Sequence, residues 1–155
     1  MDNDFVALKI EKIVNDKTLT YPLNIALASA WILGNFKGEN LKVINISKIS
    51  SLADYFVIAS ASNTTQARAM ADTIKVQIKK HGVSCGVQEG MENSNWILTD
   101  FGDVIVHIFL DIARDLYDLE GLWSEGEIIE IPTSYYSSSN SNIMESTDED
   151  SRDYF

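Results

Sequence analysis

The side chains with the most chemistry to offer in this sequence are one cysteine, Cys85, and two histidines, His81 and His107. A thiol beside an imidazole would provide a nucleophile and its general base. However, a lone cysteine usually behaves as a small buried hydrophobic residue, and His107 stands among apolar strand residues that favour core packing or an interface hydrogen bond. His81 ends a helical pattern, where a cation interacts well with the helix dipole. These residues predict no catalytic site.

Metal and phosphate sites are the other chemistry that residue spacing can reveal. Gly82, Gly86 and Gly90 recur every four residues and match neither a Walker loop nor a dinucleotide-binding fingerprint. The cysteine and the histidines do not have the spacing of a zinc site. The sequence therefore predicts no cofactor and no metal.

Composition favours a single acidic domain. The chain has 155 residues, of which 23 are acidic and 12 basic, and its formal net charge is −11. It has no apolar run of membrane-spanning length, and Asp2 and Asp4 stand where a signal peptide carries positive charge. A single cysteine without an export signal favours a reducing compartment. We expect a cytoplasmic protein with no membrane partner.

Acidic residues concentrate in 95–127, which holds eight of them and one base, Arg114. Repulsion from phosphates opposes sequence-specific binding of nucleic acid through this stretch, whereas a basic protein partner would suit it. A solvated acidic face without a partner fits the same charge count equally well.

A β-hairpin is the element that would position side chains in this acidic stretch. Trp96–Thr99 and Val104–Phe109 are rich in β-branched and aromatic residues and are joined by a short glycine-containing turn. If Phe101-Gly102 is a two-residue loop, Trp96 faces His107 across the hairpin. Phe101 then stands at the tip of the turn.

Side-chain alternation gives this hairpin two faces. One is a plain core face, with Ile97, Thr99, Val104, Val106 and Ile108. The other carries Trp96, Leu98, Ile105, His107 and Phe109. Because this second face is also largely apolar, either a helix of the same chain or a partner protein must cover it. Ordinary core is the commoner role of such residues, while an apolar residue at the turn favours a partner.

The remaining patterns predict an α/β fold. Helices are expected at Leu23–Phe36, Thr64–Lys80 and Asp111–Tyr117, and strands or extended segments at Leu41–Ile46, Asp54–Ala61, Val83–Gln88 and Ile128–Ile131. Asn63 and Gln66 resemble a capping box at the start of the second helix. A βαβ unit that runs from Asp54 to Val83 allows a parallel strand pair, and the hairpin adds antiparallel strands. We expect a mixed central sheet of about five strands with flanking helices.

Domain boundaries follow from changes in composition. Residues 1–21 are an ambiguous N-terminal extension, and Pro22 suits the first turn of the helix that opens the domain at 22–132. Leu119, Leu122 and Trp123 are expected to pack back on this domain. Residues 133–155 are rich in serine and acidic residues, so we expect a disordered tail.

Several long motifs resemble the Iojap/RsfS family of ribosomal silencing factors. They are ISSLADYFVIASASN at 49–63, WILTDFGDVIVHIF at 96–109, ARDLYDLEGLW at 113–123 and the pair Glu89-Gly90. The resemblance runs in order from about Leu23 to Trp123. It implies a nucleotidyltransferase-like topology without an active site and binding to the large ribosomal subunit through its protein fourteen. Such binding would sterically block joining with the small subunit and repress translation under nutrient limitation; the free protein would be a homodimer.

The resemblance also implies which residues face the partner. Carried over by motif, they are Trp96, Phe101, Asp103, His107, Phe109, Arg114 and Tyr117. The alternation of the hairpin independently places Trp96, His107 and Phe109 on one face. The neighbouring carboxylates would speed and orient docking on a basic ribosomal protein.

Two other functions remain open from the sequence. A nucleotidyltransferase-like enzyme needs a Gly-Ser loop and paired carboxylates that bind Mg²⁺. The corresponding stretch here has Ser50-Ser51 and Asp54, without the glycine and with one carboxylate; Asp100 or Asp103 at a turn would hold a metal poorly. The third reading is a non-catalytic dimeric scaffold, for which the very apolar helix Leu23–Phe36 leaves room.

Overall fold

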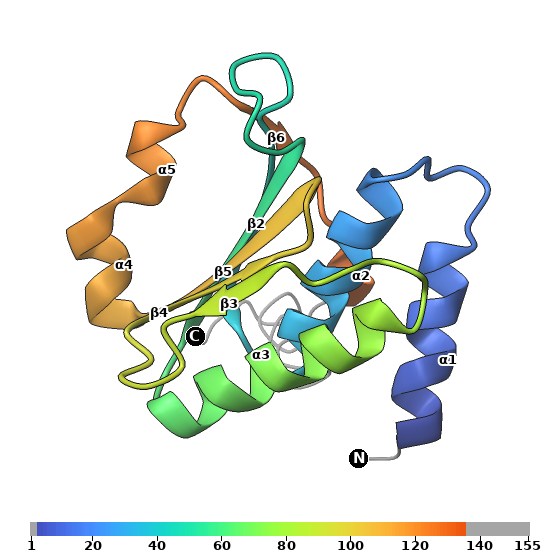
Figure 1. Cartoon of the computed structure of the whole chain (residues 1–155), viewed down its shortest axis with the longest axis horizontal. Coiled ribbons are helices and arrows are strands. Elements are labelled where there is room, and N and C mark those ends of the chain that lie inside the picture. Colours follow the sequence, from blue (N-terminus) through green and yellow to red (C-terminus); the bar gives the residue numbers. More distant parts are fainter. Residues whose placement is uncertain (1–2, 136–155) are drawn as a thin grey trace, which may run out of the picture.

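A six-stranded sheet separates two unequal layers of helices in this protein (Figure 1). The structure, a computed structural model, describes residues 3–135. The elements are α1 (Asn3–Val14), α2 (Leu23–Asn35), β1 (Glu39–Asn45), β2 (Tyr55–Ala61), α3 (Thr64–Lys79), β3 (Val87–Glu89), β4 (Trp96–Asp100), β5 (Val104–Leu110), α4 (Asp111–Tyr117), α5 (Leu119–Leu122), β6 (Glu127–Ile129) and the 3₁₀ helix η1 (Thr133–Tyr135). Helices α1, α2 and α3 lie on one side of the sheet, and the short helices α4 and α5 lie on the other (Figure 1).

The strand order is β3-β4-β5-β2-β1-β6, with β2 and β5 parallel and every other neighbouring pair antiparallel. The expected mixed α/β sheet is therefore confirmed, but the expected parallel pairing of β2 with the strand after α3 is wrong. That strand, β3, pairs with β4 at the edge. β5 is apolar except for His107 and is buried on both faces beside β2, whereas the short and polar β3 suits an edge.

The hairpin of β4 and β5 has a different turn from the expected one. The Phe101 N–H donates to the Val104 carbonyl oxygen at 2.9 Å, so Gly102-Asp103 is the two-residue loop. Gly102 has φ +88°, a value that glycine adopts without strain. Trp96 consequently faces Phe109 instead of His107. The register has moved by two residues, so each side chain keeps its expected face.

The larger core lies between the sheet and the helices α1, α2 and α3. Helix α2 is buried almost all round because α1 covers its outer side with Val6, Ile10 and Ile13, which recur at helical spacing. The N-terminal extension is thus a helix that contributes to this core. The apolar surface of α2 that left room for a dimer interface is covered within the chain.

The chain enters α3 through the expected cap. The Asn63 side-chain oxygen accepts a hydrogen bond from the Gln66 N–H at 2.8 Å. The Gln66 side chain accepts from the N–H of Ser62 at 2.7 Å, one residue earlier than in a standard capping box.

The C-terminal part of the described chain returns to the larger core. Strand β6 pairs with β1, and Tyr135 of η1 packs against this core beside α2. The tail expected from Thr133 thus begins with this 3₁₀ helix, and the rest of that tail lies outside the described residues. None of the helices in residues 3–135 has the length and hydropathy needed to cross a bilayer.

Candidate protein-binding surface

The second face of the hairpin is covered by α4 and α5 of the same chain. Together they bury a smaller core whose largest members are Phe56 and Phe109, closed by Ala113 of α4 and Leu119 of α5. Because the two helices have only seven and four residues, they leave part of this face accessible, and Trp96 is only partly buried.

Four of the expected site residues form one cluster at this place. The Trp96 ring lies 4.9 Å from the ring of Phe109, and also 4.9 Å from that of Tyr117, between ring centroids. The Trp96 indole N–H donates to Nδ1 of His107 at 3.1 Å. Contact of this kind is favourable beyond the area that the rings bury. The structure therefore confirms the shared face of Trp96, His107 and Phe109 and adds Tyr117, which the resemblance supplied, while their role in binding stays a prediction.

His107 is a neutral core residue. Its side chain is 3% exposed, and burial lowers its pKa from 6.5 to about 3. Since Nδ1 accepts from the indole, the proton of the neutral ring is on Nε2, which has no hydrogen-bond partner among residues 3–135. Cys85 packs against the larger core, on the opposite face of the sheet from Phe56 and the other ring neighbours of His107. The two residues do not form a nucleophile and base.

Arg114 fastens α4 and α5 to the sheet. Its guanidinium donates to the Glu120 carboxylate at 2.7 Å and to the Ser60 hydroxyl at 2.9 Å, and the residue is 6% exposed. Burial of Glu120 works to raise the pKa of its carboxyl, but the hydrogen bonds and charge of Arg114, with help from Lys42, outweigh burial and lower it. Arg114 is therefore occupied within the chain.

The other two expected residues lie at the opposite end of the hairpin. Phe101 is 4% exposed and belongs to the larger core, so its expected place at the turn tip is wrong. The cause is the shifted loop, which makes Phe101 the last core-facing residue before the turn. Asp103 is exposed and accepts a hydrogen bond from the Tyr21 hydroxyl at 3.0 Å.

Exposed apolar side chains on α4 were not predicted from the sequence. Ile112 and Leu116 are 86% and 75% exposed, and with Tyr117, which is 51% exposed, they line a hollow of about 410 Å³. We call Trp96, Ile112, Leu116 and Tyr117 the α4 surface. The signal was the i,i+4 spacing of Ile112 and Leu116, which puts both on one side of a short helix whose buried side is Ala113 and Arg114.

The α5 segment also differs from expectation at one residue. Leu119 is buried and Trp123 is partly buried against the smaller core, as expected. The Leu122 side chain is 76% exposed, so the expectation that it packs back on the domain is wrong.

Carboxylates lie next to the α4 surface along the chain. Asp111, Asp115 and Asp118 are exposed on or beside α4, whereas Arg114 is buried in its pair with Glu120. The accessible charge here is therefore negative, which favours a basic partner.

Asp54, Asp100 and Asp103, which were considered for nucleotidyl transfer, lie around the turn of the hairpin. Asp100 accepts a hydrogen bond from the Gly102 N–H at 2.7 Å within the turn, and the Asp54 N–H donates to the Asp103 carbonyl oxygen at 2.8 Å. Within residues 3–135, no three His, Cys, Asp or Glu side chains lie close enough together to bind a metal ion.

Comparison with known proteins places the chain in a family. The family model described as "Ribosomal silencing factor during starvation" matches residues 22–154. Relatives named "Ribosomal silencing factor RsfS" are 37% identical over 91 residues in Chromobacterium violaceum, covering 59% of this chain and 75% of the relative, and 34% identical over 95 residues in Bacillus subtilis, covering 61% and 80%. The Arabidopsis thaliana "Protein Iojap, chloroplastic" is 30% identical over 112 residues, which is 71% of this chain and 46% of the plant protein.

Solved structures agree with the sequence comparison. A crystal structure of a Chromobacterium violaceum protein superposes with a TM-score of 0.63 at 35% identity and covers 64% of this chain and 83% of that one. A Bacillus halodurans protein gives a TM-score of 0.60 at 31% identity over 70% of this chain and 96% of its own. The matched range begins at Pro22, where α2 opens, and leaves α1 outside it. The chain belongs to the RsfS family of ribosomal silencing factors.

Proposed function

We propose that this protein binds the large ribosomal subunit through the subunit's protein fourteen and uses the α4 surface to do so. The observation that carries the proposal is the pair of exposed side chains Ile112 and Leu116 beside Tyr117, whose ring contacts the partly buried Trp96, in a chain of the silencing-factor family. Apolar side chains with an adjacent aromatic anchor are the usual centre of a protein interface. The surrounding carboxylates would steer the protein to a basic partner.

The expected site residues divide by role in this proposal. Trp96 and Tyr117 contact the partner, while His107 and Phe109 support the Trp96 ring from beneath. Arg114 fixes the angle of α4 and α5 through Glu120 and Ser60. Phe101 and Asp103 shape the far end of the hairpin, where Asp103 is accessible to a large partner.

Silencing then follows from occupied volume. A protein bound at the face that meets the small subunit prevents the two subunits from joining, and this lowers translation in the cytoplasm under nutrient limitation. The bound protein needs no chemistry for this effect. The α4 surface also suits a second copy of the chain, so a free homodimer and ribosome binding would compete for it.

Sedimentation with purified ribosomal subunits tests the proposal. The full chain should co-migrate with isolated large subunits, and not with small subunits, at physiological salt. Binding to isolated protein fourteen, measured by calorimetry, then assigns the partner. Absence of the chain from the large-subunit fraction would contradict the proposal.

A further inference from the structure

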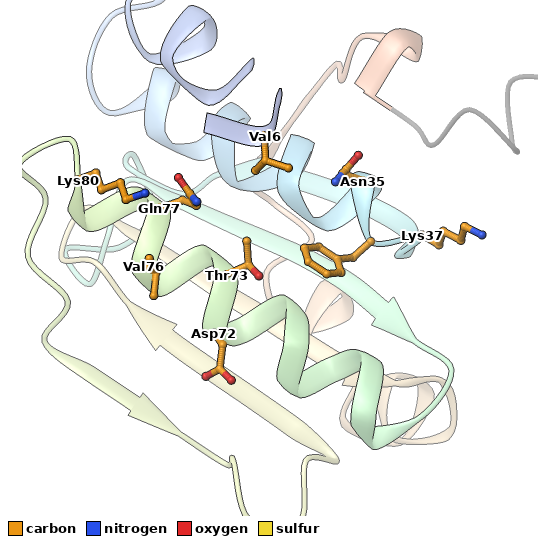
Figure 2. A pocket seen from close by; sticks show the side chains of 9 residues that line it. Val6, Asn35, Lys37, Asp72, Thr73, Val76, Gln77 and Lys80 are labelled. Atoms are coloured by element: carbon orange, nitrogen blue, oxygen red, sulfur yellow. The ribbon is translucent and has the colours of Figure 1, made fainter. Parts of the chain in front are cut away.

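A second hollow lies on the other side of the sheet, between α3, the first turns of α1 and the end of α2 (Figure 2). Its volume is about 610 Å³, and Val6, Phe36 and Val76 provide its apolar lining. Val76 is 55% exposed although it belongs to a helix that packs on the main core. The proposed ribosomal role does not use this groove, which we call the α1–α3 groove.

Gln77 is a buried polar side chain that opens into this groove. It is 8% exposed, and its amide has no hydrogen-bond partner among residues 3–135. Figure 2 shows it reaching from α3 toward α1. Because this amide is accessible from the groove, it offers both a donor and an acceptor to an incoming peptide backbone.

The rim of the groove is basic. The exposed residues Lys37 and Lys80 lie at its two ends (Figure 2). Asp72 is also on the rim, but its side chain points away from α1 and α2 (Figure 2). An apolar channel between two ammonium groups suits an acidic peptide segment that carries an apolar pair.

This chain itself supplies a segment of that composition. Residues 136–155 contain five acidic residues and one arginine, and Ile143-Met144 comes directly before Glu145 and the run Asp148–Asp150. The segment starts after Tyr135, whose carbonyl oxygen packs so closely on Gly34 that a side chain has no room there. The next three residues after Gly34 line the groove. Seven residues lie between Tyr135 and Ile143. The eight Cα–Cα steps give a reach of up to about 28 Å.

We propose that the α1–α3 groove binds the segment 136–155 of the same chain. Ile143 and Met144 occupy the apolar lining beside Val76, the backbone of the segment pairs with the Gln77 amide, and the carboxylates lie near Lys37 and Lys80. The groove is thereby a peptide-binding site that an acidic segment of another protein would also fit, in competition with the segment 136–155.

Disulfide cross-linking tests this proposal in the full chain. In a Cys85→Ser background, Val76→Cys and Ile143→Cys are combined, and intramolecular bond formation is followed under a mild oxidant such as oxidised glutathione. The matched control pairs Ile143→Cys with Leu52→Cys, which is 59% exposed in the loop between β1 and β2. Reaction with a thiol reagent in the unlinked single variants shows that both partner thiols are accessible.

We expect the groove pair to cross-link at least 10-fold faster than the control pair at low salt. Lys37→Glu with Lys80→Glu should slow the groove pair several-fold and leave the control pair unchanged. Equal rates for the two pairs would overturn the proposal. Cross-linked dimers in place of monomers would assign the groove to a second copy of the chain and would overturn it as well.

Discussion

The indole N–H of Trp96 donates a hydrogen bond to Nδ1 of His107 at 3.1 Å, beneath the α4 surface. This bond fixes the proton of the neutral imidazole on Nε2 and holds the indole against Phe109 and Tyr117. His107 thus has the core-packing and hydrogen-bonding role that its apolar neighbours in the sequence favoured, and it supports the Trp96 ring.

A tryptophan-to-phenylalanine substitution should destabilise the protein more where the indole N–H is hydrogen-bonded than where only ring area is lost. Trp96→Phe leaves Nδ1 of the buried His107 without a partner, at a cost of about 1–3 kcal/mol in the free energy of unfolding. Trp123→Phe is the control, because Trp123 packs on Phe56 at 5.4 Å and its indole N–H has no partner in residues 3–135. Urea denaturation measures both variants, and equal losses would contradict the role of the hydrogen bond.

The buried imidazole should make stability fall as the pH is lowered. In the unfolded chain His107 takes up a proton near pH 6.5, whereas burial lowers the pKa of the folded residue to about 3. Between these values the unfolded state binds more protons, so the free energy of unfolding falls by about 1.4 kcal/mol per pH unit below 6.5.

Denaturation at several pH values between 5 and 7.5 measures this effect, since carboxylates ordinarily titrate below that range. His107→Gln retains an acceptor for the Trp96 N–H but does not titrate, so its stability should be nearly constant over the same range. An equal slope in the variant and the parent chain would assign the pH dependence to another group.

Arg114 should matter for stability far more than Lys42, although both contact Glu120. Arg114→Met removes the closer partner of the partly buried Glu120 carboxylate together with the donor to Ser60, at a cost of about 3 kcal/mol. Lys42→Met removes an ion pair of 3.5 Å whose lysine is 43% exposed, and such pairs contribute less than about 1 kcal/mol. Thermal or urea denaturation of the two variants gives the comparison. A loss of the same size in both would show that burial of the guanidinium adds nothing.

Ribosome binding should depend on α4 and not on exposed apolar residues in general. Leu116→Asp removes an apolar contact, adds a buried charge to the complex and should weaken large-subunit binding at least 10-fold, or about 1.4 kcal/mol. Because Leu116 is 75% exposed, the variant should fold normally. Leu8→Asp on α1, where Leu8 is 61% exposed, is the matched control. Equal affinities of the two variants would contradict the assigned surface.

Local patterns of the sequence predicted most of the fold. The apolar run in β2, the cap of α3 at Asn63 and the alternation of the hairpin each depend on a few neighbouring residues, and each is confirmed. The partner of β2 was not predictable in this way. Its choice of β5 over β3 depends on which distant strand can be buried on both faces.

The sequence predicted which site residues lie together, but it did not predict which of them are exposed to a partner. Alternation and the resemblance placed Trp96, His107 and Phe109 together, but neither indicates which rings the short helix α4 would cover. Phe101 became a core residue because the loop begins one residue later than expected. Ile112 was missed because its exposure follows from Ala113 and Arg114 filling the buried side of α4.

The most direct test of the account is a subunit-joining assay with purified large and small ribosomal subunits. Preincubation of large subunits with the parent chain or Leu8→Asp should reduce the fraction of joined ribosomes in a sucrose gradient, and Ile112→Asp with Leu116→Asp should not. The chain should remain in the large-subunit peak. Normal joining in the presence of bound parent chain, or full inhibition by the α4 double variant, would contradict the account.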